Sequence, residues 1–153
     1  MFGVGPTPSV YEPTSWRGTM WAMQEVRLRI RWRDMDNYGH VNNAVYLNYL
    51  EECRDRMVET LFGSEEAWNF VLAHVGVDFR NQLTQADGEV IVRCEVVSFG
   101  RSSIRTREGI VKVDGTLAAE AEAVIVPRAA GEPASRPLTD EERAVLQAAV
   151  DAP

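Results

Sequence analysis

The sequence predicts an α+β domain in which an antiparallel sheet of about five strands packs against one long helix. Residues 24–34 alternate between apolar and charged side chains as a half-exposed strand does, and residues 44–62 carry apolar side chains at helical spacing. Four further alternating segments follow, and because short turns join them, they are expected to pair antiparallel. These segments span residues 72–81, 89–99, 102–113 and 117–127.

The first strand has an arginine at every second position. Its apolar residues fall between the arginines, so they point to the opposite side of the strand. The alternation therefore predicts a strand that continues to Asp34 with Trp32 on its apolar side. The apolar residues are Val26, Leu28, Ile30 and Trp32, and the arginines are Arg27, Arg29, Arg31 and Arg33.

The long helix shows an apolar stripe at steps of three and four residues. Asn42 or Asn43 is expected to cap its start, and Gly63 to end it in a left-handed conformation. Ser64 then resembles the cap of a short helix around residues 65–70. The stripe consists of Tyr46, Leu50, Cys53, Met57 and Leu61, and both tyrosines of the helix, Tyr46 and Tyr49, are expected in the core.

Composition divides the chain into three parts. Residues 1–22 are rich in Gly, Pro, Ser and Thr and are expected to form a flexible arm, in which the role of Trp16 and Trp21 stays open. Residues 23–128 form the predicted domain. Residues 129–153 are a linker and a terminal helix, whose Thr139 and Glu142 have capping-box spacing. The 153-residue chain has the size of one domain.

Charge and composition exclude several classes of function. The net charge of -7 argues against a nucleic-acid surface, although a few converging arginines would still bind a phosphate-bearing substrate. No apolar run reaches the roughly 18 residues of a membrane span, and the N-terminus lacks the features of a secretory signal. Cys53 and Cys94 are expected to be buried apolar side chains rather than a disulfide. A cytoplasmic protein is therefore expected.

The polar stretch "DMDNYGHVNN", residues 34–43, poses the question of function. Its beginning has the spacing of a calcium loop, but Val45 stands where a bidentate glutamate is needed. His40 and His74 are the only histidines, and no cysteine lies at zinc-ligand spacing from either. No metal site is therefore expected. One alternative is a polar turn, whereas the other is an acyl-transfer site, in which a carboxylate faces the open N–H groups of a helix start.

The segment "RWRDMDNYGHVNNAVYLNYLEECR", residues 31–54, resembles the signature of hotdog-fold thioesterases of the 4-hydroxybenzoyl-CoA thioesterase type. The order of elements over residues 24–127 is also similar to that fold, in which a curved antiparallel sheet wraps one long helix. The resemblance implies hydrolysis of an acyl thioester of coenzyme A or of acyl carrier protein. It implies no cofactor beyond the substrate's own coenzyme A. It further implies a homodimer, or a tetramer built from dimers.

The same resemblance implies roles for individual residues. Asp36 matches the catalytic Asp, which acts as nucleophile or general base, and the backbone N–H of Asn43 matches the group that polarises the thioester carbonyl. Glu51 matches an acidic position of the family helix and is expected beside the substrate. Some bacterial acyl-CoA thioesterases have a functional His in place of Asn43 and a Tyr in place of Trp32, so those side-chain roles do not transfer.

The "HVNN" form is similar to plant acyl-ACP thioesterases, in which an Asp, an Asn and a His alternate across this loop. Asp36 and His40 match that arrangement, but Tyr38 replaces the Asn and is assigned here to substrate contact. His40 is expected either to orient groups and shuttle protons or only to bond the loop backbone. Asp34 is expected to anchor the loop or to pair with an arginine, Arg31 or Arg33.

Residues 98–103, "SFGRSS", resemble the hairpin whose basic residue contacts the phosphates of coenzyme A in relatives. Arg101 is therefore the candidate for that contact, against the alternative of a solvated turn arginine, and Arg128 is a weaker candidate. Two rival functions stay open. One is a non-catalytic module that binds or senses acyl-CoA, and the other is a hydratase or dehydratase on the same fold, although its usual Asp and His arrangement is missing.

Overall fold

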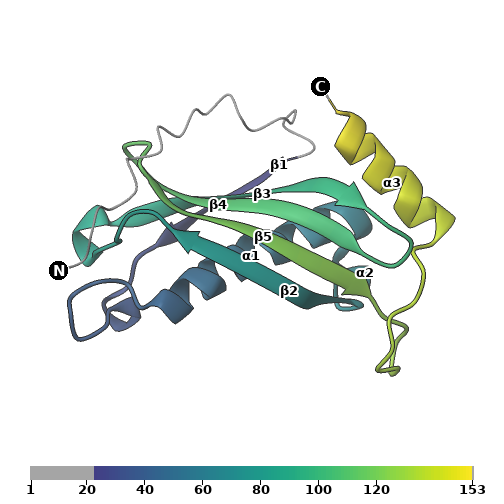
Figure 1. The fold of residues 1–153 in the computed structure, drawn as a ribbon, viewed down its shortest axis with the longest axis horizontal. Helices are drawn as coiled ribbons and strands as arrows, with labels where there is room; N and C mark the ends of the chain where they lie inside the picture. The colour runs from purple at the N-terminus through teal and green to yellow at the C-terminus, as the bar shows by residue number, and fades with distance from the viewer. Residues whose placement is uncertain (1–22, 153) are drawn as a thin grey trace.

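The computed structural model describes residues 23–152. Its strands are β1 (Met23–Arg29), β2 (Phe70–Phe79), β3 (Glu89–Phe99), β4 (Ile104–Lys112) and β5 (Leu117–Pro127). Its helices are α1 (Asn43–Phe62), α2 (Ser64–Ala67) and α3 (Asp140–Asp151), with short 3-10 helices η2 (Trp32–Asp34) and η3 (Gln85–Asp87). The strands form one antiparallel sheet in the order β1-β3-β4-β5-β2 (Figure 1). The predicted α+β architecture is confirmed.

The long helix α1 covers one face of the sheet and lies behind the strands in the view of Figure 1. Its buried side chains form the centre of the core against the inward residues of β3, β4 and β5. The Asn42 side chain caps the start by accepting a hydrogen bond from the Ala44 N–H at 2.9 Å. Gly63 ends α1 with φ 90° and ψ 155°, so the positive φ is confirmed, whereas ψ lies outside the left-handed helical region.

The sheet topology leaves β1 and β2 at its two edges. β3, β4 and β5 are consecutive antiparallel neighbours, while β1 pairs with β3 and β2 pairs with β5. Met23 is paired with Glu95 and Arg29 with Glu89, which places the end of β1 next to the start of β3. The polar loop that follows β1 therefore lies at one end of the sheet. The turn between β3 and β4 lies at the other end.

Three details differ from the sequence prediction. β1 ends at Arg29, and Trp32 begins the 3-10 helix η2 with 78% of its surface exposed, so its expected place on the apolar side of a strand is wrong. The alternation stops because the Asp34 carboxylate accepts from the Arg31 N–H and closes a turn. The residues after α1 also differ, because Gly63 rather than Ser64 precedes α2, and β2 already begins at Phe70.

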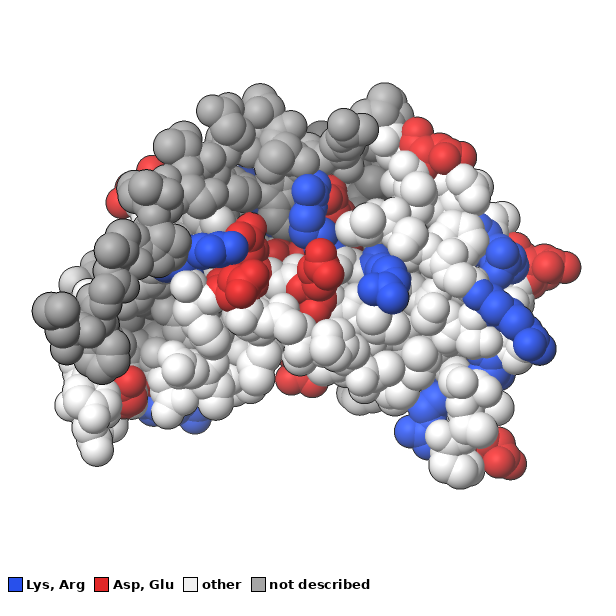
Figure 2. Space-filling view, viewed as in Figure 1, with Lys and Arg blue, Asp and Glu red and all other residues white. Residues whose placement is uncertain are grey.

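The opposite face of the sheet, which we call the outer face, carries charged residues of both signs. Figure 2 shows these acidic and basic side chains mixed over the middle of the sheet. α3 packs at one end of the sheet, with Leu146 fully buried and the predicted capping box of Thr139 and Glu142 present. Cys53 and Cys94 are free and buried, as expected. The expected arm, with Trp16 and Trp21, lies outside the described residues.

Candidate functional site

The loop between β1 and α1 is a short hairpin held by backbone hydrogen bonds. Met35 and Val41 form an isolated antiparallel bridge, and the Asn42 N–H donates to the Asp34 carbonyl at 2.9 Å. The Asp36 N–H donates to the His40 carbonyl at 2.7 Å, which closes the tip of the loop. These bonds hold Asp36 in a defined turn just before the start of α1 rather than on a free coil.

Asp34 anchors this loop from beneath. Its buried carboxylate accepts the Tyr49 hydroxyl at 2.7 Å and the Arg31 N–H at 2.8 Å, and it forms an ion pair with the Arg31 guanidinium. Burial alone would raise the pKa of Asp34, but these hydrogen bonds and the arginine outweigh it and hold the pKa below its ordinary value. The expected pairing with Arg31 is confirmed. Asp34 thus has a structural role, since its ionised carboxylate holds the loop in place.

Asp36 presents its carboxylate differently. One oxygen, Oδ1, accepts the Tyr38 N–H at 2.8 Å and the His40 N–H at 3.1 Å. The other oxygen, Oδ2, has no hydrogen-bond partner among residues 23–152, and the side chain is half-buried. Two backbone donors therefore orient the carboxylate while one oxygen stays open to a ligand or a water molecule.

The start of α1 offers an open backbone donor beside this loop. Within the described part of the chain, the Asn43 N–H has no hydrogen-bond partner, because the Asn42 side chain takes the Ala44 N–H and the Asn42 carbonyl takes the Val45 N–H. The partial positive charge of a helix start adds to this donor. A carboxylate with an open oxygen and a free helix N–H are thus held by the same ten-residue segment.

The other predicted residues divide into two groups. His40 is half-buried, and Tyr38 is 86% exposed, and both belong to the loop that holds Asp36. Glu51 is eight positions beyond Asn43 on α1, about 12 Å along the helix axis at 1.5 Å per residue. Its exposed side chain lines a cavity of about 340 Å³ between α1 and β2.

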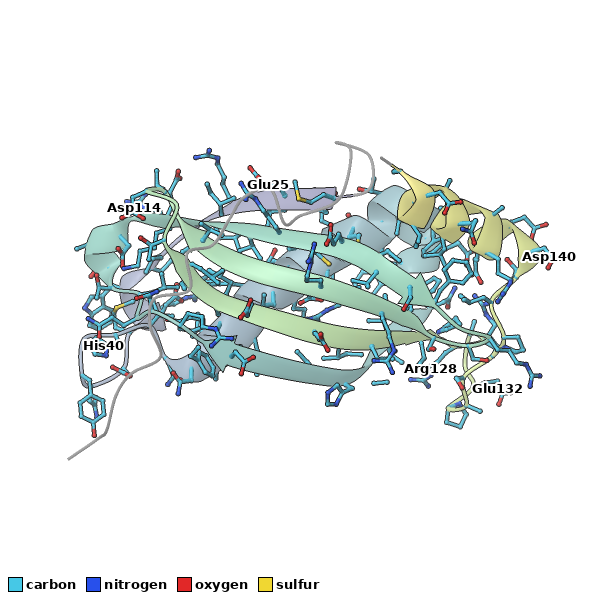
Figure 3. All side chains as sticks on the ribbon, turned by 45° about the horizontal axis from the view of Figure 1, so that its top comes forward. Glu25, His40, Asp114, Arg128, Glu132 and Asp140 are labelled. Atoms are coloured by element: carbon cyan, nitrogen blue, oxygen red, sulfur yellow. The ribbon has the colours of Figure 1, made fainter. Side chains whose placement is uncertain are left out.

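Arg101 lies far from this loop within one chain. It belongs to the turn after β3, an 11-residue strand that begins beside the end of β1 and spans about 33 Å. The Leu138 N–H donates to its carbonyl at 2.9 Å, which ties the turn to the segment before α3. Figure 3 shows the corresponding separation between His40 at one end of the sheet and Arg128 at the other.

The sequence also matches a known protein family. The model of the thioesterase-like superfamily matches residues 30–148, which include the loop, α1 and the four strands β2 to β5. The chain belongs to the thioesterase-like superfamily. The resemblance to hotdog thioesterases is therefore confirmed at the level of the superfamily. No protein among those of curated function matches the chain.

Solved structures of similar fold include thioesterases. One from Thermus thermophilus, which holds coenzyme A and zinc, is 35% identical over 85% of this chain and 96% of that one, with a TM-score of 0.74. A candidate acyl-CoA thioesterase from Xanthomonas campestris is 32% identical over 67% of this chain and 90% of that one, with a TM-score of 0.59.

A more distant structure supports the hotdog fold of this thioesterase-like protein. It is a variant of 4-hydroxybenzoyl-CoA thioesterase in complex with 4-hydroxybenzoyl-CoA, which is 12% identical over 82% of this chain and 99% of that one. At a TM-score of 0.71 the similarity extends over the whole domain, and at this identity it concerns the fold alone.

Two absences concern only the described part of this thioesterase-like protein. Between residues 23 and 152, no three His, Cys, Asp or Glu side chains come close enough together to bind a metal ion. Within the same range, every helix is too short or too polar to traverse a lipid bilayer.

Sequence reasoning missed a buried ion pair beneath the 340 Å³ cavity. The Arg54 guanidinium binds the Glu108 carboxylate through two hydrogen bonds of 2.8 Å, and both side chains are at most 5% exposed. Burial opposes the charge of Arg54, but the bonds to Glu108 raise its pKa. The sequence did contain a pattern that predicts the burial of both side chains. Arg54 follows Cys53 on the apolar stripe of the helix, and Glu108 alternates with Thr106 and Ile110, which face inward.

Proposed function

We propose that this protein hydrolyses an acyl thioester of coenzyme A or of acyl carrier protein to a free acid and a thiol. Membership of the thioesterase-like superfamily and the coenzyme A bound to a 35% identical relative support the reaction class. The observation that carries the proposal is that the open oxygen of Asp36 and the free N–H of Asn43 belong to the same short segment before and at the start of α1. An acyl-transfer site needs a base or nucleophile and an oxyanion donor, and one loop holds both.

Two routes are chemically balanced with these groups. In the first, Asp36 takes a proton from water while the water oxygen attacks the carbonyl carbon, and the carbonyl electrons move to the oxygen held by the Asn43 N–H. The C–S bond then breaks, and the thiolate receives the proton. In the second, the Asp36 carboxylate attacks the carbonyl carbon and expels the thiolate. Water then cleaves the resulting mixed anhydride to the free acid and the Asp36 carboxylate, and the proton that is released passes to the thiolate.

His40 and Tyr38 complete the proposed loop. The His40 N–H and carbonyl both bond to Asp36, so the imidazole is carried by the same backbone that orients the carboxylate. We propose that the imidazole, which has one nitrogen able to accept a proton and one able to donate, relays the proton to the departing thiolate. Tyr38, with its ring almost fully exposed, is proposed to contact the substrate.

The proposed coenzyme A contact requires a second subunit. The guanidinium of Arg101 has no partner within residues 23–152, and Arg128 and Arg143 lie at the same end of the sheet. Because β3, which is about 33 Å long, separates this end of the sheet from the end that holds the Asp36 loop, we propose that the Asp36 and Arg101 of one site come from different subunits. We therefore propose a homodimer with composite sites, in which each site combines Asp36 of one subunit with Arg101 of the other. Any tetramer would be built from this dimer.

The strand β2 is the proposed dimer edge. Among residues 23–152 no strand pairs with its outer edge, and Asp78 is the only Asp, Glu, Lys or Arg among its ten residues. Antiparallel pairing with β2 of a second copy would place the Arg101 end of one chain beside the Asp36 end of the other. It would also bring the cavity lined by Glu51 toward that Asp36, so we propose that this cavity receives the acyl group.

The test is thiol release from short-chain, medium-chain, long-chain and aromatic acyl-CoAs. We expect hydrolysis of at least one class, and Asp36→Asn should lower turnover about 10²- to 10⁴-fold, the usual cost of losing a general base. Asp151→Asn, a matched change at the far end of α3, should leave turnover unchanged. Retained activity in Asp36→Asn would refute the mechanism. Tight acyl-CoA binding without thiol release by either protein would instead indicate a binding module.

A further inference from the structure

A second cavity lies on the outer face of the sheet, opposite α1. It has a volume of about 510 Å³ and is lined by residues of β2, β3, β4 and β5 together with Val150 of α3. None of its lining residues belongs to the loop of Asp36 or to α1, so it is separate from the proposed thioester site. Its polar lining consists of His74, Glu95, Arg105, Thr106, Arg107 and Glu122.

Glu95 is the unusual member of this lining. Its side chain is 5% exposed, and its Oε1 accepts a hydrogen bond from Arg107 Nε at 2.6 Å. Its Oε2 is buried and is the single side-chain oxygen or nitrogen atom of this kind without a hydrogen-bond partner among the described residues. A buried carboxylate oxygen without a donor is costly, so this atom is suited to an N–H donor supplied by a ligand.

Arg105 supplies the complementary charge. It is exposed in the same cavity, and its guanidinium has no ion pair or hydrogen bond among residues 23–152. Glu95 is directly opposite Arg107 in the register of β3 and β4, so Arg105 is its diagonal neighbour, about 7–8 Å away between backbones. An acceptor and a donor thus belong to neighbouring positions of adjacent strands in the lining of one cavity.

Apolar side chains complete the cavity. Val97 is 50% exposed, and it lines the cavity together with Val124 of β5 and Val150 of α3. These valines lie on three different elements, which gives the polar pair an apolar wall suited to a branched aliphatic group.

We propose that the outer-face cavity binds a small zwitterion with an aliphatic side chain, whose ammonium group donates to Glu95 Oε2 and whose carboxylate pairs with Arg105. An amino acid such as leucine has this combination of groups. Arg107 holds Glu95 in place through Oε1, and Glu122, which is opposite Arg107 on β5, adds a second carboxylate near the ammonium group. Binding here is independent of thioester hydrolysis.

The test is isothermal titration calorimetry of the full chain with three probes of similar shape. L-leucine has both charged groups, 3-methylbutylamine lacks the carboxylate, and 4-methylpentanoate lacks the ammonium group. We expect saturable binding of one leucine per chain, binding of the amine at least tenfold weaker, and no saturable binding of the acid. The proposal is overturned if neither leucine nor the amine binds, or if the acid binds as tightly as leucine.

Single substitutions test whether leucine binds in the outer-face cavity. Glu95→Gln should weaken leucine binding at least tenfold, whereas Glu89→Gln, on the same strand but in an exposed ion pair outside the cavity, should not change it. Arg105→Gln alters only an exposed side chain and should reduce leucine binding to the level of the amine, so it tests the site even if Glu95→Gln does not fold. Unchanged leucine binding in Arg105→Gln would overturn the assignment.

Discussion

The Tyr49 hydroxyl donates a hydrogen bond of 2.7 Å to Asp34 Oδ2, and this bond joins the second turn of α1 to the turn that precedes the Asp36 loop. Both groups are buried. Burial and the bond to Asp34 together raise the pKa of Tyr49, so it remains a donor across the physiological range. The position of the proposed catalytic loop relative to the helix start therefore depends on a contact that lies outside the loop.

Tyr49→Phe should destabilise the protein by about 1–3 kcal/mol, because it leaves a buried carboxylate with one donor fewer. Denaturant titration measures the change in the free energy of unfolding. Tyr38→Phe is the matched control, since that ring is 86% exposed and its hydroxyl makes no hydrogen bond within the described residues. Equal stability of the two variants would mean that the Asp34 contact contributes nothing.

The contribution of Asp34 to stability should depend on pH. Its pKa is lower in the folded chain than the ordinary value of 3.8, so the folded state favours the carboxylate. The stabilisation is therefore fully present well above the unfolded pKa of about 3.9 and is lost as the pH falls through the lower folded value. Unfolding of wild type and Asp34→Asn should differ most above about pH 5 and converge in acid. A difference that grows in acid would contradict this sign.

The Arg54–Glu108 pair should respond very differently to single and double replacement. Arg54→Met or Glu108→Leu alone leaves a buried charge without its partner, which is expected to cost about 3–5 kcal/mol. The double variant Arg54→Met with Glu108→Leu removes both charges and should lose less than either single variant. Thermal or denaturant unfolding of the wild type, the two single variants and the double variant gives the four free energies of this double-mutant cycle. Additive losses would show that the two charges do not stabilise each other.

Composite sites predict complementation between two inactive chains. Asp36→Asn retains Arg101, and Arg101→Ala retains Asp36, so a mixed dimer has one site with both residues intact. After the two variants are unfolded and refolded together in equal amounts, activity should return to about a quarter of wild type, because half of the dimers are mixed and each has one intact site. Mixing without exchange of subunits is the control. Activity no greater than the average of the separate variants would place both residues in one subunit.

The sequence was sufficient for the elements whose periodicity reflects the core. The stripe of α1 and the alternation of β3, β4 and β5 follow burial directly, so their bounds agree with the prediction to within a few residues. Trp32 shows the limit of this reasoning. It continues the alternation of β1, but the hydrogen bond between Arg31 and Asp34 turns the chain before Trp32, and local capping prevails over the pattern.

The site was predictable only in part, for a physical reason. Asp36, His40 and Asn43 are neighbours in sequence, so any fold that caps α1 at Asn42 brings them together. The places of Arg101 and Glu51 depend instead on long-range packing and, in the proposed dimer, on a second chain. The Arg54–Glu108 pair joins a helix to a strand far away in sequence, and neither residue alone reveals that its charge is buried.

The sheet order has a consequence for folding kinetics. β3, β4 and β5 are joined by short turns and form contacts of low sequence separation, so they are expected to form early. β1 pairs with β3 only after the chain has passed through α1 and β2, a closure with a large entropic cost. The Asp36 loop lies between β1 and α1 and would be completed by this late step. A refolding protein should therefore regain its helical signal before its activity.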